Sequence, residues 1–460
     1  TGGGNLITTT GATFTGNIST AGISSVTAGT SNFVAGVNAG NSITSGGNYN
    51  TVVGDEAGTA LTTGGQNVAV GMNAMVGQTT ASYNVAVGQA ALSANTTGAN
   101  TTAVGWNSLT ANTTGASNTA VGSSALGANT TGGDITALGY NALRFNTTGG
   151  DNVAVGTEAL TANTTGGQNV AVGRQSLKSN TTASNNTALG NYSLFYNTTG
   201  GDNTAVGRSA LEDNTTGSAN TAVGMGSLES NTTGTLSTAI GRDALKSSTT
   251  ANSNTAVGRE ALRDTTTGGE NVAIGLNAMA GNTTGPRNTA IGKQCLQNLT
   301  TGDNNTAIGF MAGYNNNTNA TTTGYGNTLI GTYAHTNAAN TQYANALGQS
   351  IGASGGYTTL GSGGSDIRAS HGSTTWSTVS DERYKKDITT STAGLSFVNE
   401  LRPVTWNYKT LGELPTTFSA YEADSTEVFK NTQTNHGFIA QEVKAVIDNH
   451  SEIKDGFRLW

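Results

Sequence analysis

The chain has 460 residues, of which 66 are Gly and 3 are Pro, with 10% charged residues and a formal net charge of −7. Disordered chains are usually rich in charge and Pro, so this composition does not favour disorder. Because the sequence has neither a Lys/Arg stripe nor a run of about 18 apolar residues, we expect no nucleic-acid partner and no membrane span.

Residues 1–50 are rich in Gly, Thr and Ser, with short alternating stretches, and predict irregular β structure that leads into the next region. The chain begins at Thr1 without Met or a signal peptide. We therefore expect a fragment, whose missing N-terminus would attach it to other proteins.

Residues 51–350 contain a motif, Asn-Thr-Ala-Val-Gly or a close variant, that recurs every 17 residues. Its closing glycine falls at Gly54 and at each seventeenth residue to Gly309, then shifts by five residues and returns at Gly331 and Gly348. A period this strict predicts a β-solenoid in which each repeat contacts its neighbours. At ~4.8 Å per strand, the fifteen regular steps predict a length of roughly 70 Å.

The motif itself predicts a short strand, whose side chains alternate between two faces. Val153 and Val155 share one face, which we expect inside the coil with a second inward anchor at Leu160. Ala154 and Gly156 share the other face, where a second backbone could approach closely. Because a 17-residue coil has a thin interior, we predict a homotrimer with this Ala/Gly face as its contact.

The Asn-Thr-Thr-Gly segment of each repeat predicts a turn, with Asn in left-handed geometry and Gly at positive φ. It also matches the glycosylation sequon, at Asn95, Asn112, Asn129 and Asn163 among others. Glycans one strand spacing apart would collide, so we favour the structural interpretation.

Two other features argue against conventional enzyme chemistry in the array. Cys295 occupies a position filled by Ala elsewhere, which predicts a small buried side chain. Acidic residues such as Glu158 and Glu260 occupy variable outward positions and form no pair suited to glycoside hydrolysis. We expect no metal site and no cofactor.

The "NTAVG" and "NVAVG" strands resemble the YadA-like head repeat of trimeric adhesins, a left-handed parallel β-roll. The resemblance covers about 300 residues of the chain. The unit here is longer by the Asn-Thr-Thr-Gly segment, which leaves the handedness open. A parallel triple-stranded β-helix is the alternative fold.

The period ends near residue 351. Residues 351–375 are rich in Gly, Ser and Thr and predict an extended neck. From residue 376 charged and aromatic residues appear with helical spacing, which predicts a small α+β domain over residues 376–460. Three ordered motifs follow, "SDERYKKDI", "LRPV" and "GFIAQEV".

These motifs resemble the intramolecular chaperone autoprocessing domain at the C-terminus of phage tail fibres and tailspikes. The resemblance implies that the domain helps three chains assemble and then removes itself. It implies Ser380 as nucleophile, Lys385 as general base and Val379–Ser380 as the scissile bond. A serine hydroxyl needs a nearby base, and lysine serves only when burial depresses its pKa.

Alternatives exist for several of these residues. Ser380 could instead cap a helix, with acidic residues in the first turn, and Lys386 is the alternative base. His436 has a structural role in this interpretation. A helix whose apolar stripe includes Val443, Val446 and Ile447 would pack against the domain. The family's long C-terminal helix is missing, so we expect a chaperone truncated at its end.

The sequence thus predicts a bacteriophage tail fibre: a trimeric shaft for host attachment followed by a single-turnover serine autoprotease. The expected partners are a host receptor or glycan and other tail proteins. The expected location is the virion, after folding in the host cytoplasm. A bacterial trimeric adhesin and a tailspike depolymerase acting on host glycans are the alternatives.

Overall fold

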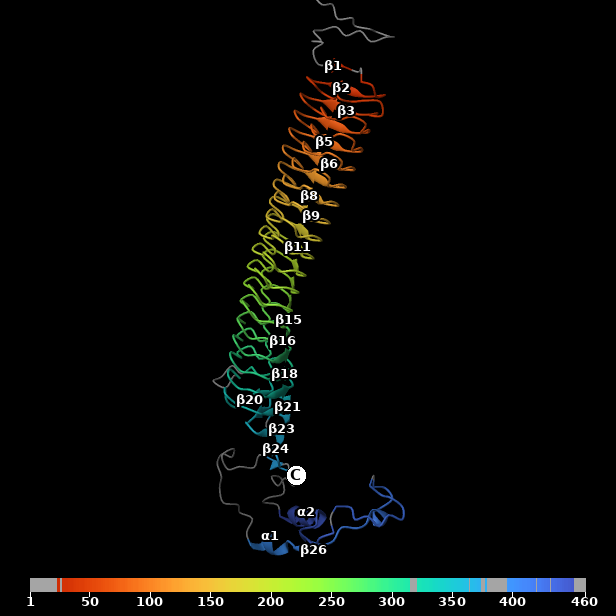
Figure 1. Ribbon diagram of the computed structural model, residues 1–460. Helices are drawn as coiled ribbons and strands as arrows, with labels where there is room; N and C mark the ends of the chain where they lie inside the picture. The colour runs from red at the N-terminus through yellow and green to blue at the C-terminus, as the bar shows by residue number, and fades with distance from the viewer. Residues whose placement is uncertain are drawn as a thin grey trace, which may run out of the picture. The chain divides into compact units, whose positions relative to one another are not determined.

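The computed structural model describes residues 23–24, 27–314, 321–363, 365–373, 377–378, 395–418, 420–430 and 432–450. The chain forms two units, residues 1–379 and 380–460. The first is a parallel β-solenoid and the second is a small region with helices and strands (Figure 1). The prediction of a mainly β chain with a 17-residue solenoid and a small C-terminal region is confirmed.

In-register stacking of short strands defines the solenoid. Ala171 of one strand pairs with Ala154 on one side and Ala188 on the other, and this parallel register recurs from coil to coil. The stacked strands are β2 (Phe33–Ala35), β3 (Thr51–Val53), β4 (Val68–Val70), β5 (Val85–Val87), β6 (Thr102–Val104), β7 (Thr119–Val121), β8 (Thr136–Leu138), β9 (Val153–Val155), β10 (Val170–Val172), β11 (Thr187–Leu189), β12 (Thr204–Val206), β13 (Thr221–Val223), β14 (Thr238–Ile240), β15 (Thr255–Val257), β16 (Val272–Ile274), β17 (Thr289–Ile291), β18 (Thr306–Ile308), β19 (Thr328–Ile330) and β21 (Asn345–Gln349).

Antiparallel strands flank this stack at both ends. β1 (Ile23–Ser24) pairs antiparallel with β2. At the other end β23 (Tyr357–Ser362) adds in parallel to β21, and β24 (Ser365–Ser370) and β25 (Ser377–Thr378) follow antiparallel. A separate parallel pair joins β20 (His335–Thr336) and β22 (Gly352–Ala353).

The strands face the opposite way from the prediction. Ala154 is completely buried, whereas Val153 and Val155 are only half-buried on the outer side. The interior already holds the fully buried side chains of Ala159 and Leu160, so only a methyl group fits beside them. The predicted Ala/Gly contact face is therefore wrong, and branched side chains occupy the outer face instead.

The inward anchor at Leu160 is confirmed, but its backbone is unusual. Leu160 has φ of 53°, in the left-handed region that bulky residues rarely adopt. The equivalent leucines of most coils share this conformation and are fully buried. Burial of one leucine per coil offsets a local backbone cost of about 1–3 kcal/mol.

Glycine at the end of each strand is required for two reasons. Gly156 has φ of 135°, and a Cβ atom there would lie 2.6 Å from the carbonyl oxygen of Gly173 in the next coil. The same contact recurs at the equivalent glycines of the other coils, which together form a glycine column. The strict repetition of this glycine thus reflects both its positive φ, which other residues rarely adopt, and the close approach of stacked coils.

The asparagines of the Asn-Thr-Thr-Gly segments are buried in a ladder, not placed in left-handed turns. Asn163 is fully buried, is absent from the positive-φ positions, and donates from Nδ2 to Asn146 Oδ1 at 2.7 Å and to Gly166 O at 2.9 Å. The predicted turn geometry is wrong because the side-chain amide, rather than the backbone, determines this position. The buried amides support the structural interpretation over glycosylation.

The five-residue shift in phase leaves the strand register intact. β18 pairs with β19 through Thr306 and Thr328, across the insertion. Leu329 stands at the interior strand position and is fully buried, while Gly313 stands at the leucine-anchor position. A Cβ on Gly313 would meet side-chain atoms of Leu296 at 2.4 Å and of Leu329 at 3.3 Å. The larger Leu329 thus compensates for the missing anchor.

The described residues of the second unit contain few regular elements. These are α1 (Leu395–Glu400), β26 (Val404–Trp406), the 3₁₀ helix η2 (Leu411–Glu413), β27 (Asn435–Gly437) and α2 (Ala440–Asn449). β26 and β27 pair antiparallel. Among its described residues only Ile447 and His450 are buried.

Candidate functional site

Two of the three C-terminal motifs meet through β26 and β27. The "LRPV" motif runs into β26, and the "GFIAQEV" motif runs from β27 into α2. Thr405 and His436 face each other in the antiparallel register. His436 is exposed. The pairing brings motifs separated by some thirty residues into one local structure.

An ion pair links the same two motifs. Arg402 Nε donates to Glu442 Oε2 at 3.1 Å, and its Nη2 bonds Glu442 Oε1. The guanidinium holds the pKa of Glu442 below its ordinary value, and the carboxylate raises the pKa of Arg402. Sequence reasoning missed this pair, although each motif carries one of the two charges.

The two helices contact each other around His450. Its Nε2 lies 3.3 Å from Glu400 Oε1, and its ring lies edge-on to Phe397 with centroids 5.3 Å apart. On α2, Ile447 is buried and Val443 and Val446 are half-buried. The burial of Ile447 agrees with the predicted packing role of this apolar stripe.

The residues predicted to carry out the cleavage lie outside the described residues. This holds for Ser380, Lys385, the alternative base Lys386 and the scissile residue Val379. The Ser-Lys dyad therefore stays a prediction.

The sole cysteine is buried, as predicted. Cys295 is fully buried and its Sγ lies 3.2 Å from the carbonyl oxygen of Ala307. Burial raises the pKa of its thiol to about 12. Ser108 fills the equivalent position in another coil and bonds the equivalent carbonyl at 3.0 Å. Cys295 is thus a packing residue rather than a nucleophile.

The described part of the chain also bears on other functions. No cluster of three or more His, Cys, Asp or Glu side chains suited to a metal ion occurs there. Nor does any helix in those residues have the length and apolarity needed to span a membrane.

Comparison with known proteins gives one match. No curated protein and no solved structure matches the chain significantly. The family model Peptidase S74, described as the chaperone of endosialidase, matches residues 380–452 and none of the solenoid. This family is a self-cleaving intramolecular chaperone domain. The C-terminal unit that pairs β26 with β27 and Arg402 with Glu442 is therefore similar to the chaperone of endosialidase.

Proposed function

We propose that this chain is a bacteriophage tail-fibre protein, in which a trimeric solenoid serves host attachment and a C-terminal chaperone assembles the trimer and then cleaves itself off. The observation that carries the proposal is a chaperone-family match, over residues 380–452, that follows a long parallel β-solenoid. In this function the protein folds in the host cytoplasm and ends in the virion. Its partners are other tail proteins and a receptor or glycan on the host.

The outer face of the solenoid supports trimer formation. In strands β3 to β19, and in β21 and β23, the residue that follows the buried strand position is aliphatic and lies on the outer face, and Leu189 for example is 47% exposed. No charged residue occupies either outward position of these strands. We call this column the aliphatic stripe: Val53, Val70, Val87, Val104, Val121, Leu138, Val155, Val172, Leu189, Val206, Val223, Ile240, Val257, Ile274, Ile291, Ile308, Ile330, Leu347 and Leu360.

A continuous apolar stripe of this kind marks an interaction surface, because soluble proteins rarely expose one. We place this stripe at the contact between copies, in place of the Ala/Gly face. Each copy would then bury the same column against its neighbours, which suits a parallel homotrimer assembled in register.

The second unit also supports assembly. Its described residues expose large apolar side chains, including Val398 at 58%, Phe418 at 56% and Phe438 at 50%. Burying these side chains against other copies would stabilise the unit. This is the behaviour expected of a domain that brings three chains together.

The cleavage would proceed at Val379–Ser380. Neutral Lys385 would take the hydroxyl proton of Ser380 while Ser380 Oγ attacks the carbonyl carbon of Val379. The amide nitrogen of Ser380 then takes that proton and leaves as a new amino terminus, and water hydrolyses the resulting ester. Burial of Lys385 on trimer assembly would lower its pKa and so couple cleavage to folding. The boundary between the two units falls at this bond, which supports the assignment.

Intact-mass spectrometry tests the cleavage. The full chain is expressed beside Ser380→Ala and Lys385→Ala, with Lys386→Ala as the matched control. We expect the wild type and Lys386→Ala to lose residues 380–460, and the other two variants to stay whole. An intact wild-type chain contradicts autoproteolysis in this protein, and cleavage in Lys385→Ala contradicts the assigned base.

Native mass spectrometry tests the trimer. In Ile274→Lys/Ile291→Lys two neighbouring residues of the aliphatic stripe become charged, and we expect the trimer to dissociate while the circular dichroism of the solenoid persists. Tyr83→Lys, at a 60% exposed residue outside the stripe, should leave the trimer intact. If the trimer persists in the double variant, the aliphatic stripe is not the contact between copies.

A further inference from the structure

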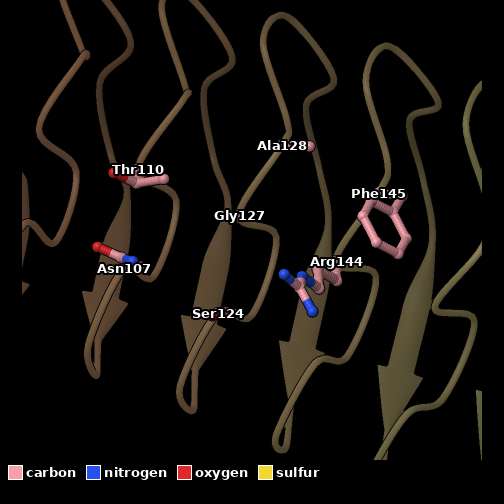
Figure 2. Close-up of a pocket in the computed structure, with 7 residues that line it drawn as sticks. All are labelled: Asn107, Thr110, Ser124, Gly127, Ala128, Arg144 and Phe145. Carbon is pink, nitrogen blue, oxygen red and sulfur yellow. The ribbon is translucent and has the colours of Figure 1, made fainter.

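A hollow of about 240 Å³ opens on the side of the solenoid across three successive coils. Asn107 and Thr110 lie at one end of it and Arg144 and Phe145 at the other, with Gly127 between them (Figure 2). Ser124 and Ala128 complete its lining. At the volume of liquid water this hollow holds about eight water molecules, which is the size of one sugar residue rather than a long ligand.

Gly127 creates the hollow without being required by the backbone. It is the only glycine at its position in the repeat between Thr59 and Gln297. Its φ is not in the left-handed region, and a Cβ there would meet its nearest atoms at 3.4 to 3.9 Å, which is ordinary contact. The equivalent residue three coils earlier is Val76. A side chain could therefore fill this position, and its absence leaves space.

Arg144 faces the hollow and has no carboxylate partner among the described residues. It is the first basic residue of the chain and the only one before Arg174. Its guanidinium lies 5.0 Å from the ring centroid of Phe145. Phe145 is 48% exposed, and Trp106, next to the lining residue Asn107, is 53% exposed. A cation, an aromatic face and several polar side chains thus converge at one place.

The other basic residues at the position of the repeat that Arg144 occupies all have a carboxylate partner, which Arg144 does not have among the described residues. Lys178 pairs with Glu158 at 2.8 Å, twenty residues earlier, and Lys246 pairs with Glu229, seventeen residues earlier. Lys246 and Arg263 also pair with carboxylates three residues earlier, and Arg263 with the residue that follows it. The four corresponding positions around Arg144 hold uncharged residues: Ser124, Gly127, Asn141 and Phe145.

We propose that this hollow binds a sugar that carries a carboxylate, such as a uronic or sialic acid residue. The carboxylate would take the place of the missing acidic side chain and accept paired hydrogen bonds from the Arg144 guanidinium. The apolar face of the sugar ring would lie against Phe145, and Asn107, Thr110 and Ser124 would bond its hydroxyl groups. The inference deepens the proposed attachment function, on which it rests, by naming a site and a class of glycan.

Saturation-transfer NMR on the full chain tests the site with glucuronate, N-acetylneuraminate, neutral glucose and inorganic phosphate. We expect the two acidic sugars to receive saturation at their ring protons and glucose to receive much less. Arg144→Gln should weaken binding about tenfold or more, because hydrogen bonds to a charged group are lost. Arg208→Gln, at another array cation with no carboxylate partner among the described residues, should change nothing.

Two further variants change the hollow without removing Arg144. Gly127→Val should fill it, and Ser124→Glu should give Arg144 an internal partner in the arrangement that Glu158 provides for Lys178. Both should abolish binding without lowering the melting temperature. Equal binding of glucose, displacement by phosphate as effective as by sugar acid, or full binding in Gly127→Val would each overturn the proposal.

These outcomes are distinct from the failure of the proposed function. Sugar binding is measured on the purified chain, whether or not it cleaves itself or belongs to a virion. If the chain stays whole in the mass experiment but binds glucuronate through Arg144, the proposed sugar site holds and the proposed autoproteolysis does not.

Discussion

The solenoid and the C-terminal unit differ in where their apolar side chains lie. Each regular coil buries two small side chains and one leucine completely, as Ala154, Ala159 and Leu160 show. Among the described residues of the C-terminal unit, only one apolar side chain, Ile447, is buried, and several aromatic rings are exposed. Repetition lets a single chain complete a narrow core, whereas the described residues of the C-terminal unit leave several large apolar side chains exposed.

The largest difference should appear on truncating one apolar side chain in each region. Leu160→Ala removes a fully buried anchor and should reduce the free energy of unfolding by about 2–5 kcal/mol. Phe438→Ala removes a half-exposed ring and should cost about 1 kcal/mol or less in the monomer. Urea unfolding followed by circular dichroism measures both. An equal loss of unfolding free energy in the two variants would contradict the proposed difference in burial between the two regions.

The second prediction compares two glycines within the solenoid. Gly156→Ala should destabilise by about 2–4 kcal/mol, since it adds backbone strain and a clash with Gly173 O. Gly127→Ala has neither problem and should stabilise by about 0.4–1 kcal/mol, because it reduces the freedom of the unfolded chain. Thermal melts of the two variants should shift in opposite directions. A shift in the same direction would refute this account of the glycine column.

The asparagine ladder offers a smaller test of the solenoid. The ladder stops at Ser248, and neither Asn231 Oδ1 nor Ser248 Oγ has a hydrogen-bond partner within the described residues. Ser248→Asn should restore the bond to Asn231 Oδ1 and stabilise by about 0.5–1.5 kcal/mol. The measurement is the urea midpoint, with Ser247→Asn, one residue outside the ladder position, as the control.

The smallest effect concerns the exposed ion pair of the C-terminal unit. The folded-state pKa of Glu442 is lowered by Arg402, so the pair stabilises fully above the unfolded-state pKa and loses its effect as pH falls through the folded-state value. Carboxyl NMR titration should give a lowered midpoint in the wild type and an ordinary one in Arg402→Gln. Because the pair is exposed, melting should change little. An unchanged midpoint in Arg402→Gln would assign the shift to another group.

The sequence predicted the solenoid, its 17-residue period and its division from the C-terminal unit. It could do so because stacking equivalent residues requires an exact period, and the amino-acid sequence shows the periodic glycine and leucine directly. The position of Leu160 inside the coil followed from the same pattern. The motifs of residues 376–460 predicted the chaperone family that matches residues 380–452. The Ser380–Lys385 dyad stays a prediction.

Only the tertiary structure decided which face of each strand lies inside. Alternation gives two faces but no preference between Val155 and Ala154, and the space left beside Leu160 admits only the smaller side chain. The same limit applies to the hollow at Gly127 and to the pairing of Arg402 with Glu442. These depend on distances between residues of different coils or motifs, which the order of residues along the chain does not contain.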